Sequence, residues 1–455
     1  MDLAQISRDI PEYDHFLTID ELTASTHQLV RDYPELASMR IVGQTRQGDP
    51  IELLTIKGGE KQAFVFGGPH PNEPIGTMTI EYLTRRLCED EALRAELGYT
   101  WHFIKSIDSD GMRLNEGWFK GPFTPSNYAR HFYRPAPFDQ IEWTFPVDYK
   151  DLHFHSPLPE TQALMDVIDE VKPALIYSLH NAGFGGVYYY VSEQCPPLYD
   201  IFSQIPTWYD LALDLGEPEV PYVDQFAPAI FGMIYTSKSY DYLEQNGVAN
   251  PAEAMQSGTS SAEYASKYGS FYLVVELPYY DDPRVNDQSL SDTLRRDAIL
   301  KGLDLADEFD GWINAHLEKV SGDLQIETPF HRAVKAFMKG GKAQREAERQ
   351  WAQTSEETQR PASQAELFSN LFGSRFYRLL ILGMFARMME AEIAADNGSP
   401  LIAEARDEAL AYLKQQSESL ESQLNYRALP IRSLVGVQVC AGLATAVYVR
   451  DRPKP

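Results

Sequence analysis

The sequence predicts an α/β protein with a mixed, largely parallel central sheet flanked by helices, followed by a mainly helical C-terminal extension. Short apolar runs alternate with helical patterns between residues 40 and 180. This order of elements builds a sheet with connecting helices. The apolar run 271–275 indicates another buried strand, and the patterns beyond residue 321 are helical. We therefore expect one domain over residues 1–320 and a mainly helical region over residues 321–455.

Local signals place the individual elements. A capping box at Thr18–Glu21 predicts the start of a helix. The apolar run Phe64–Phe66 predicts a buried strand that Gly67-Gly68 ends, with a helix to follow over about residues 75–87. By the same reasoning we expect strands near 40–42, 51–56, 101–104, 174–179 and 187–191, and helices over about 289–320, 365–394 and 403–424.

The composition excludes some classes of partner. The chain of 455 residues carries 40 basic and 66 acidic residues, a formal charge of −26. Such a surface repels phosphate backbones and anionic lipids, so we expect neither a nucleic-acid nor a membrane partner. The apolar run 434–449 is shorter than the ~20 residues of a membrane span and contains Gln438. It predicts a buried helix or a pair of strands.

The N-terminus and the cysteines favour a cytoplasmic location. The first residues, MDLAQISRDIPEYDHF, lack the apolar stretch of a signal peptide. The three cysteines, Cys88, Cys195 and Cys440, are widely spaced and form no CxxC pair. A disulfide framework is therefore not expected, and a reducing compartment fits best.

Metal-binding and acid–base residues follow three of the predicted strands. His70 and Glu73 come after the strand at 64–66, His180 follows the strand at 174–179, and Glu276 follows the strand at 271–275. Ligands of open α/β sheets gather beyond the carboxyl ends of the strands, so these side chains can meet in one crevice. Two histidines and a glutamate, with a fourth position left to water, are typical of a hydrolytic zinc site. A second glutamate beside that water can carry its proton.

The order of these motifs resembles the zinc carboxypeptidases of the carboxypeptidase A type. The motifs that carry the resemblance are the following: His70-Pro71-Asn72-Glu73, Ser178-Leu179-His180, Val275-Glu276-Leu277, Ser257-Gly258-Thr259-Ser260, Ser109-Asp110-Gly111, and the stretch Gly43–Ile51. The resemblance spans roughly residues 15–285. It implies one zinc ion per chain, held by His70, Glu73 and His180, with Glu276 as general base and acid.

The resemblance also implies residues for catalysis and substrate binding. Arg113 would polarise the scissile carbonyl, since an oxyanion needs a fixed positive partner besides zinc. Arg130 would grip the terminal carboxylate of the substrate with its bidentate fork, and its neighbour Arg134 could replace it. Asn115, close to Arg113, is a further candidate for substrate binding.

The chain departs from the family pattern at several positions. Asn72 and Pro74 make the His-x-x-Glu loop similar to that of the family's deacylase branch. The aspartate that usually braces the first histidine would fall near Asn127, a neutral amide. No tyrosine precedes the Ser-Gly motif at the usual place; Tyr240, Tyr242 and Tyr264 are substitutes between which the sequence does not choose.

Three functions follow in order of preference. The first is a zinc-dependent carboxypeptidase that removes the C-terminal residue of a peptide or peptide-like small molecule. The second is a zinc-dependent amidase or deacylase acting on an N-acyl amino acid, and the third is a catalytically inactive zinc-binding scaffold. The amphipathic C-terminal helices suit a cap on the catalytic domain, a wall of the cleft or a subunit interface; we favour a homodimer.

Overall fold

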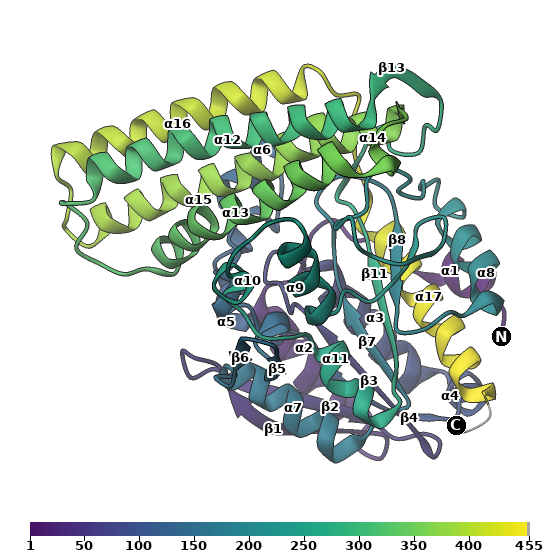
Figure 1. Cartoon of the computed structure of the whole chain (residues 1–455). Coiled ribbons are helices and arrows are strands. Elements are labelled where there is room, and N and C mark those ends of the chain that lie inside the picture. Colours follow the sequence, from purple (N-terminus) through teal and green to yellow (C-terminus); the bar gives the residue numbers. More distant parts are fainter. Residues whose placement is uncertain (453–455) are drawn as a thin grey trace.

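One mixed sheet of nine strands forms the centre of the molecule (Figure 1). The structure is a computed structural model and describes residues 1–452. The spatial order of the strands is β1 (Ala37–Gln44), β2 (Pro50–Ile56), β4 (Tyr99–Ile104), β3 (Lys61–Gly67), β7 (Leu175–Leu179), β11 (Phe271–Glu276), β8 (Tyr188–Val191), β10 (Ile230–Gly232) and β9 (Gln225–Ala227). The neighbours β4, β3, β7 and β11 are parallel. Antiparallel pairs join β1, β2 and β4, and also β11 to β8. The predicted α/β architecture with a mixed sheet is confirmed.

Helices cover both faces of this sheet. Along β3, Ala63 and Val65 belong to one buried cluster, whereas Phe64 and Phe66 belong to another. This alternation is the period of two expected for a strand buried on both faces. The helices of this part are α1 (Leu3–Asp9), α2 (Ile19–Asp32), α3 (Ile75–Glu89), α4 (Glu91–Leu97), α5 (Ser109–Arg113), α6 (Pro125–His131), α7 (Pro159–Val171), α8 (Pro196–Thr207), α9 (Thr236–Gln245), α10 (Pro251–Met255), α11 (Ser261–Ala265) and α17 (Ile431–Asp451).

The last helix, α17, packs on the sheet that the N-terminal part of the chain builds. It contacts α3 and α8 and lies against β7 and β11. Gln438, fully buried, donates from its side chain to the carbonyl oxygen of His180 at 2.9 Å and accepts from the Thr79 hydroxyl at 2.7 Å. Within residues 1–452, α17 is the one helix long and apolar enough to cross a membrane, and 83% of its most apolar window is buried inside the protein. The predicted apolar run 434–449 is therefore a buried helix.

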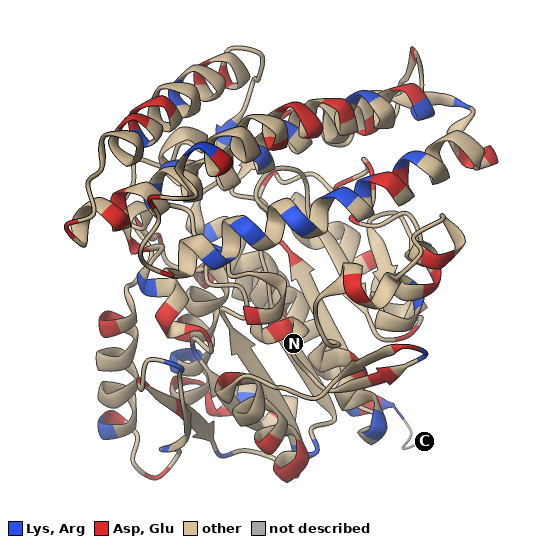
Figure 2. Ribbon diagram, turned by 60° about the vertical axis from the view of Figure 1, so that its left-hand side comes forward, with Lys and Arg blue, Asp and Glu red and all other residues tan. Residues whose placement is uncertain are grey.

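Four long helices form a separate layer across one end of the sheet (Figure 1). They are α12 (Arg295–Val320), α13 (Pro329–Thr354), α15 (Ser374–Ala394) and α16 (Pro400–Glu421), and α14 (Gln364–Phe368) precedes a single π-helical turn, Ser369–Gly373. Acidic and basic residues are interspersed along these helices, whereas the central strands are mostly uncharged (Figure 2). This distribution is typical of a solvated helical layer beside a buried sheet.

The division of the chain differs from the one expected at residue 320. Helix α12 belongs to the helical layer, because it packs against α13 and α15, whereas α17 returns to the sheet. Three short strand pairs complete the fold: β5 (Val147–Tyr149) with β6 (Leu152–Phe154), β12 (Tyr280–Asp281) with β15 (Arg427–Ala428), and β13 (Leu290–Leu294) with β14 (Pro361–Ser363). The β12–β15 pair joins the segment after β11 to the segment before α17, and the β13–β14 pair lies beside α12 and α14 in the helical layer.

Candidate metal centre and active site

The loop with His70 and Glu73 follows β3 directly. Gly68 has a φ of 63°, a conformation that favours glycine. A Cβ on Gly67 would lie 2.7 Å from the carbonyl oxygen of Lys105, so the chain passes too closely there for a side chain. The N–H of Glu73 donates to the carbonyl of His70 at 3.1 Å, which closes a tight turn. Local sequence therefore places the two side chains beside each other at the end of a strand.

Sheet register brings the other two residues to the same edge. Gly67 of β3 pairs with Leu179 of β7, and Leu179 pairs with Val275 of β11, all in parallel. His180 and Glu276 each come directly after these paired positions. The carboxyl ends of three neighbouring parallel strands thus present their polar residues together, as the sequence predicts.

The side chains of His70, Glu73 and His180 converge. Their ligand atoms all lie within 4.8 Å of one another, and all three residues are buried. The Nδ1 atoms of the two histidines are 3.2 Å apart. Nδ1 of His70 is 3.0 Å from Oε1 of Glu73, and Nδ1 of His180 is 3.2 Å from Oε2. Two nitrogen ligands of a tetrahedral zinc ion at ~2.0 Å lie about 3.3 Å apart, so the donor set fits zinc.

Burial favours the ligand form of His70. Burial, followed by the charge of Arg134, lowers the pKa of His70 to about 3. The ring is then neutral, and a neutral imidazole is the form that binds a metal. Its other nitrogen, Nε2, is buried and has no hydrogen-bond partner among residues 1–452. Asn127, where the resemblance would put a bracing aspartate, donates instead to the carbonyl of Pro122.

Glu276 lies beside the cluster at the end of β11. Its Oε1 is 3.8 Å from Nδ1 of His180, and the residue is 8% exposed. Burial, together with the nearby carboxylates of Glu219 and Glu73, raises the pKa of Glu276 well above its ordinary value. A carboxyl in such surroundings can accept a proton and hold it, which a general base that later acts as an acid must do.

A buried hydroxyl group supports His180 from behind. Its Nε2 lies 2.8 Å from the hydroxyl of Ser178. A second buried group lies near Ser178: the hydroxyls of Tyr272 and Ser261 bond to each other, and Ser261 donates to Oε1 of Glu142 at 2.8 Å. Partners that orient a ligand histidine in this way fix its ring and tautomer. The sequence places Ser178 in a motif with His180. It gives no sign that Tyr272, Ser261 and Glu142 lie near the site, because no local pattern links them.

Arg134 is the arginine that reaches the cluster. Its Nη1 donates to Oε1 of Glu73 at 3.1 Å, and its Nε donates to Gln140 at 3.3 Å. One quarter of its side chain is exposed. This guanidinium is therefore the fixed positive charge that borders the candidate site.

The two arginines that the sequence favoured for the site do not reach the cluster of His70, Glu73 and His180. Arg113 pairs with Asp20 at 2.9 Å and with Asp49 at 3.2 Å, and its side chain is 39% exposed. Arg130 lies on α6 and pairs with Glu390 of α15 at 2.6 Å. Both guanidiniums are held by carboxylates that lie outside the cluster.

Asn115, the other candidate for substrate binding, connects two backbone segments. Its Nδ2 donates to the carbonyls of Gly111 and Tyr133 at 3.1 and 2.9 Å, and its Oδ1 accepts from the N–H of Tyr133 at 2.9 Å. The residue is fully buried. All polar atoms of this amide are therefore used to hold the loop that leads to Arg134.

The tyrosines considered from the sequence lie in other surroundings. Tyr264 donates to Asp169, Tyr242 packs on Tyr222, and Tyr240 packs on Tyr149. By contrast, the hydroxyl of Tyr377 on α15 accepts from the N–H of Gly183 at 3.3 Å, three residues after His180. Tyr377 belongs to the helical region, which contains none of the motifs that carry the family resemblance.

Comparison with known proteins agrees with this geometry. The family model described as zinc carboxypeptidase matches residues 22–268, more than half of the chain. The chain belongs to the zinc carboxypeptidase family. His70, Glu73 and His180 lie within the matched range, and Glu276 follows it. Residues 295–421, which form the helical layer, lie outside the matched zinc carboxypeptidase domain.

Individual relatives match different shares of this chain. A carboxypeptidase B of Astacus astacus is 32% identical over 97 residues, which cover 20% of this chain and 32% of the relative. A metallo-carboxypeptidase structure from Burkholderia cenocepacia is 17% identical, with a TM-score of 0.35, and covers 58% of this chain and 60% of its own. The carboxypeptidase A of Helicoverpa armigera is 12% identical, with a TM-score of 0.37, and covers 78% and 79%. The curated relative is thus matched over about a third of its length.

Proposed function

We propose that this protein is a zinc-dependent carboxypeptidase that hydrolyses the C-terminal amide bond of a peptide or peptide-like small molecule. The observation that carries the proposal is the convergence of His70, Glu73 and His180 at one sheet edge, with Glu276 beside them. Family membership supplies the fold and the class of chemistry. Zinc, when bound, polarises a carbonyl group and makes water more acidic.

The residues of the chain have separate roles in this reaction. Glu276 takes a proton from the attacking water as the new C–O bond forms, and gives it to the leaving nitrogen as the C–N bond breaks. Arg134 supplies a fixed positive charge for a developing oxyanion or for the terminal carboxylate of the substrate. In this proposal it takes the place that the sequence suggested for Arg113 and Arg130, which are engaged in ion pairs.

The second candidate, an amidase or deacylase, is supported by the state of Arg130. Its guanidinium pairs with Glu390, so this residue offers no free fork to a terminal carboxylate. An enzyme that recognises its substrate through the acyl group would depend less on that grip. The two functions can be separated with one zinc-loaded preparation of the enzyme. Its hydrolysis rates are measured on the free and the C-terminally amidated forms of the same peptide. A carboxypeptidase prefers the free acid strongly; equal rates would support the amidase.

We also propose a reducing, cytoplasmic environment. Cys88, Cys195 and Cys440 are all buried and unpaired. Burial raises the pKa of the Cys440 thiol to about 12 and that of Cys195 to about the same value. Thiols of this kind are structural and inert. Mass measurement after alkylation of the unfolded protein would detect three modified thiols.

A further inference from the structure

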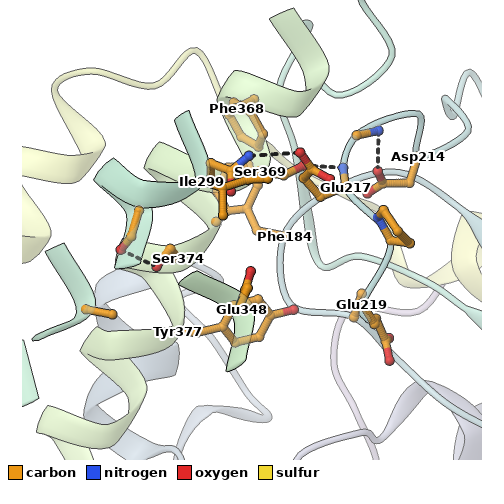
Figure 3. Close-up of a pocket in the computed structure, with 18 of the residues that line it drawn as sticks. Phe184, Asp214, Glu217, Glu219, Ile299, Glu348, Phe368, Ser369, Ser374 and Tyr377 are labelled. Carbon is orange, nitrogen blue, oxygen red and sulfur yellow. Dashed lines mark hydrogen bonds between the residues drawn. The ribbon is translucent and has the colours of Figure 1, made fainter. Parts of the chain in front are cut away.

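Helix α15 of the helical layer borders the candidate site at two places. At the first it forms one wall of a cavity of about 350 Å³ between the sheet domain and the helical layer, which Tyr377 of α15 and Glu219 line (Figure 3). Helix α13 supplies part of the same wall, including Glu348. At the second place, α15 packs on α6 and on the loop that leads to Arg134. Both helices lie outside the matched zinc carboxypeptidase domain.

Arg387 of α15 bonds to the backbone at this second place. Its Nη1 donates to the carbonyl oxygens of His131 and Phe132 at 2.7 and 3.0 Å. Its Nη2 donates to the carbonyl oxygen of Leu114 at 2.8 Å. One guanidinium therefore ties together two segments of the loop that leads to Arg134.

The charge of Arg387 is buried without a carboxylate beside it. Within residues 1–452 Arg387 forms no ion pair, and its guanidinium lies over the ring of Phe330, 4.3 Å from the ring centroid. Burial, followed by the charge of Arg130, lowers the pKa of Arg387 from 12.5 to about 10. A buried charge without a counter-ion is costly. The three bonds to carbonyl oxygens are what compensates this charge, and such charge-assisted bonds are strong.

The groups that Arg387 contacts also fix Tyr133. Asn115, which directly follows Leu114, bonds to both the N–H and the carbonyl oxygen of Tyr133. The ring of Tyr133 packs edge-on against Phe330 at 5.2 Å between centroids, and Phe330 is the ring that Arg387 covers. The backbone and the side chain of Tyr133 are therefore both held through neighbours of Arg387.

The backbone of Arg134 comes next in the chain. Its N–H lies 3.4 Å from Sδ of Met384, about one turn before Arg387 on α15. The side chain of Arg134 donates to Glu73 and to Gln140, and one quarter of it is exposed. Such a long side chain has many rotamers. It keeps one position at the cluster only if the backbone that carries it is fixed.

Two other contacts between α15 and α6 are of a different kind. Arg130 pairs with Glu390 at 2.6 Å, but both side chains are about a third exposed, and exposed pairs contribute little. Gly383 lies so close to the carbonyl oxygen of Ala129 that a Cβ would not fit. This close approach brings the helices together but bonds to neither Tyr133 nor its neighbours. Arg387 is therefore the polar group of α15 that holds the segment before Arg134.

We propose that Arg387 is a positioning residue of this enzyme: it fixes the backbone that carries Arg134, and thereby holds the Arg134 guanidinium beside Glu73. Arg387 acts through Arg134 and not through contact with the substrate. The helical layer is then part of the catalytic unit, although it lies outside the matched domain. This inference rests on the proposed carboxypeptidase function, because Arg134 has its role in that reaction.

A double-mutant cycle of Arg387 and Arg134 tests the inference. The value of kcat/KM for one peptide is measured with zinc-loaded wild type, Arg387→Met, Arg134→Gln and the double variant. Arg387→Met should lower kcat/KM about tenfold in the wild-type background, because a misplaced charge stabilises the transition state poorly. In the Arg134→Gln background the same change should lower kcat/KM less than about twofold, since the group that Arg387 positions is already absent.

Two further variants separate positioning from a general loss of stability. Arg387→Lys keeps a charged donor that reaches fewer carbonyl oxygens, so its kcat/KM should lie between those of wild type and Arg387→Met. It takes the place of Arg387→Met in the cycle if the methionine variant does not fold. Arg375→Met is the matched control, because Arg375 lies on the same helix and bonds to Ser419 of α16. This change should leave kcat/KM as it is.

The outcomes separate the two proposals. An equal loss of kcat/KM in both backgrounds, or no loss in folded Arg387→Met, would overturn the positioning role and leave the carboxypeptidase intact. If the wild type hydrolyses no peptide, the carboxypeptidase proposal fails, and hydrogen exchange tests the positioning by itself. The N–H groups of residues 131–134 should then exchange about tenfold faster in Arg387→Met than in Arg375→Met. Equal exchange in these two variants would contradict the positioning role.

Discussion

Nδ1 of His180 lies 3.2 Å from Nδ1 of His70, although 110 positions separate the two residues in the chain. The pairing of β3 with β7 creates this proximity, because the two parallel strands end at the same level. With Glu73 between them, the two rings converge on one point as metal ligands do.

Replacement of His180 by alanine should abolish zinc binding. Removal of one of three protein ligands leaves too few donors for a stable hydrolytic zinc site. Elemental analysis should find about one zinc per wild-type chain and less than about 0.1 per variant chain. His153→Ala is the matched control, because His153 is exposed and pairs only with Asp148. Retention of zinc by the His180 variant would show that the metal binds elsewhere.

Ser178→Ala should weaken zinc binding without removing a ligand. The hydroxyl of Ser178 lies 2.8 Å from Nε2 of His180, on the side of the ring away from Nδ1. Loss of such a supporting partner lowers metal affinity by about 10–100-fold. Competition with a chelator measures the affinity. Ser270→Ala, which removes a buried hydroxyl bonded to the carbonyl of Pro173, should cost stability but leave the zinc affinity as it is.

Arg134→Gln should reduce kcat/KM far more than the same change at Arg113 or Arg130. Arg134 is the guanidinium that contacts the cluster, and loss of one donor to a developing oxyanion costs about 10²-fold. Substitutions in the exposed ion pairs of the other two arginines should change kcat/KM by less than about threefold. Steady-state kinetics of the three zinc-loaded variants give the kcat/KM values for this comparison. A large loss at Arg130 with none at Arg134 would restore the assignment made from the sequence.

Stability should depend on pH through Glu348. Burial, and then the charge of Glu217, raise the pKa of Glu348 from 4.5 to about 7. The folded state therefore binds this proton more tightly than the unfolded chain does, and ionisation favours unfolding. The cost is absent below about pH 4.5, grows as the pH rises, and is complete above about pH 7. After allowance for partial exposure it is on the order of 2 kcal/mol.

Glu348→Gln removes that ionisation. The melting temperature of the variant relative to the wild type should therefore rise between pH 5 and pH 8. Glu346→Gln provides the comparison for a change of charge on the exposed face of α13. If the difference between Glu348→Gln and the wild type were the same at both pH values, Glu348 would not titrate in this range.

The convergence of His70, Glu73 and His180 could be predicted because each residue follows a local strand pattern. Phe64–Phe66 followed by two glycines indicates a strand and a tight turn, and the apolar run before Glu276 indicates a second strand. Parallel strands then bring their ends together whatever the details of the loops. Helical structure was also expected over 365–394, where the chain forms α14, a π-helical turn and α15, and over 403–424, which α16 largely covers.

The assignment of the arginines depended on information that periodicity does not contain. Residues 105–146 form irregular structure with short helices, so the chain alone does not show which guanidinium faces the cluster. Arg130 and Arg134 are one turn apart in sequence, yet one contacts Glu390 and the other Glu73. The position of α17 on the sheet and the cavity wall from α13 are tertiary relationships between distant segments, and no local pattern predicts them.

The role of Glu276 as general base is tested most simply by comparing zinc-loaded wild type with Glu276→Gln. The rate at which each releases the last residue of a peptide is measured together with its zinc content. Glutamine occupies nearly the same volume but does not accept the proton of the attacking water. We expect equal zinc content and a fall in kcat of about 10³-fold or more. A variant that retains its zinc and releases the residue at the wild-type rate would show that Glu276 is not the general base.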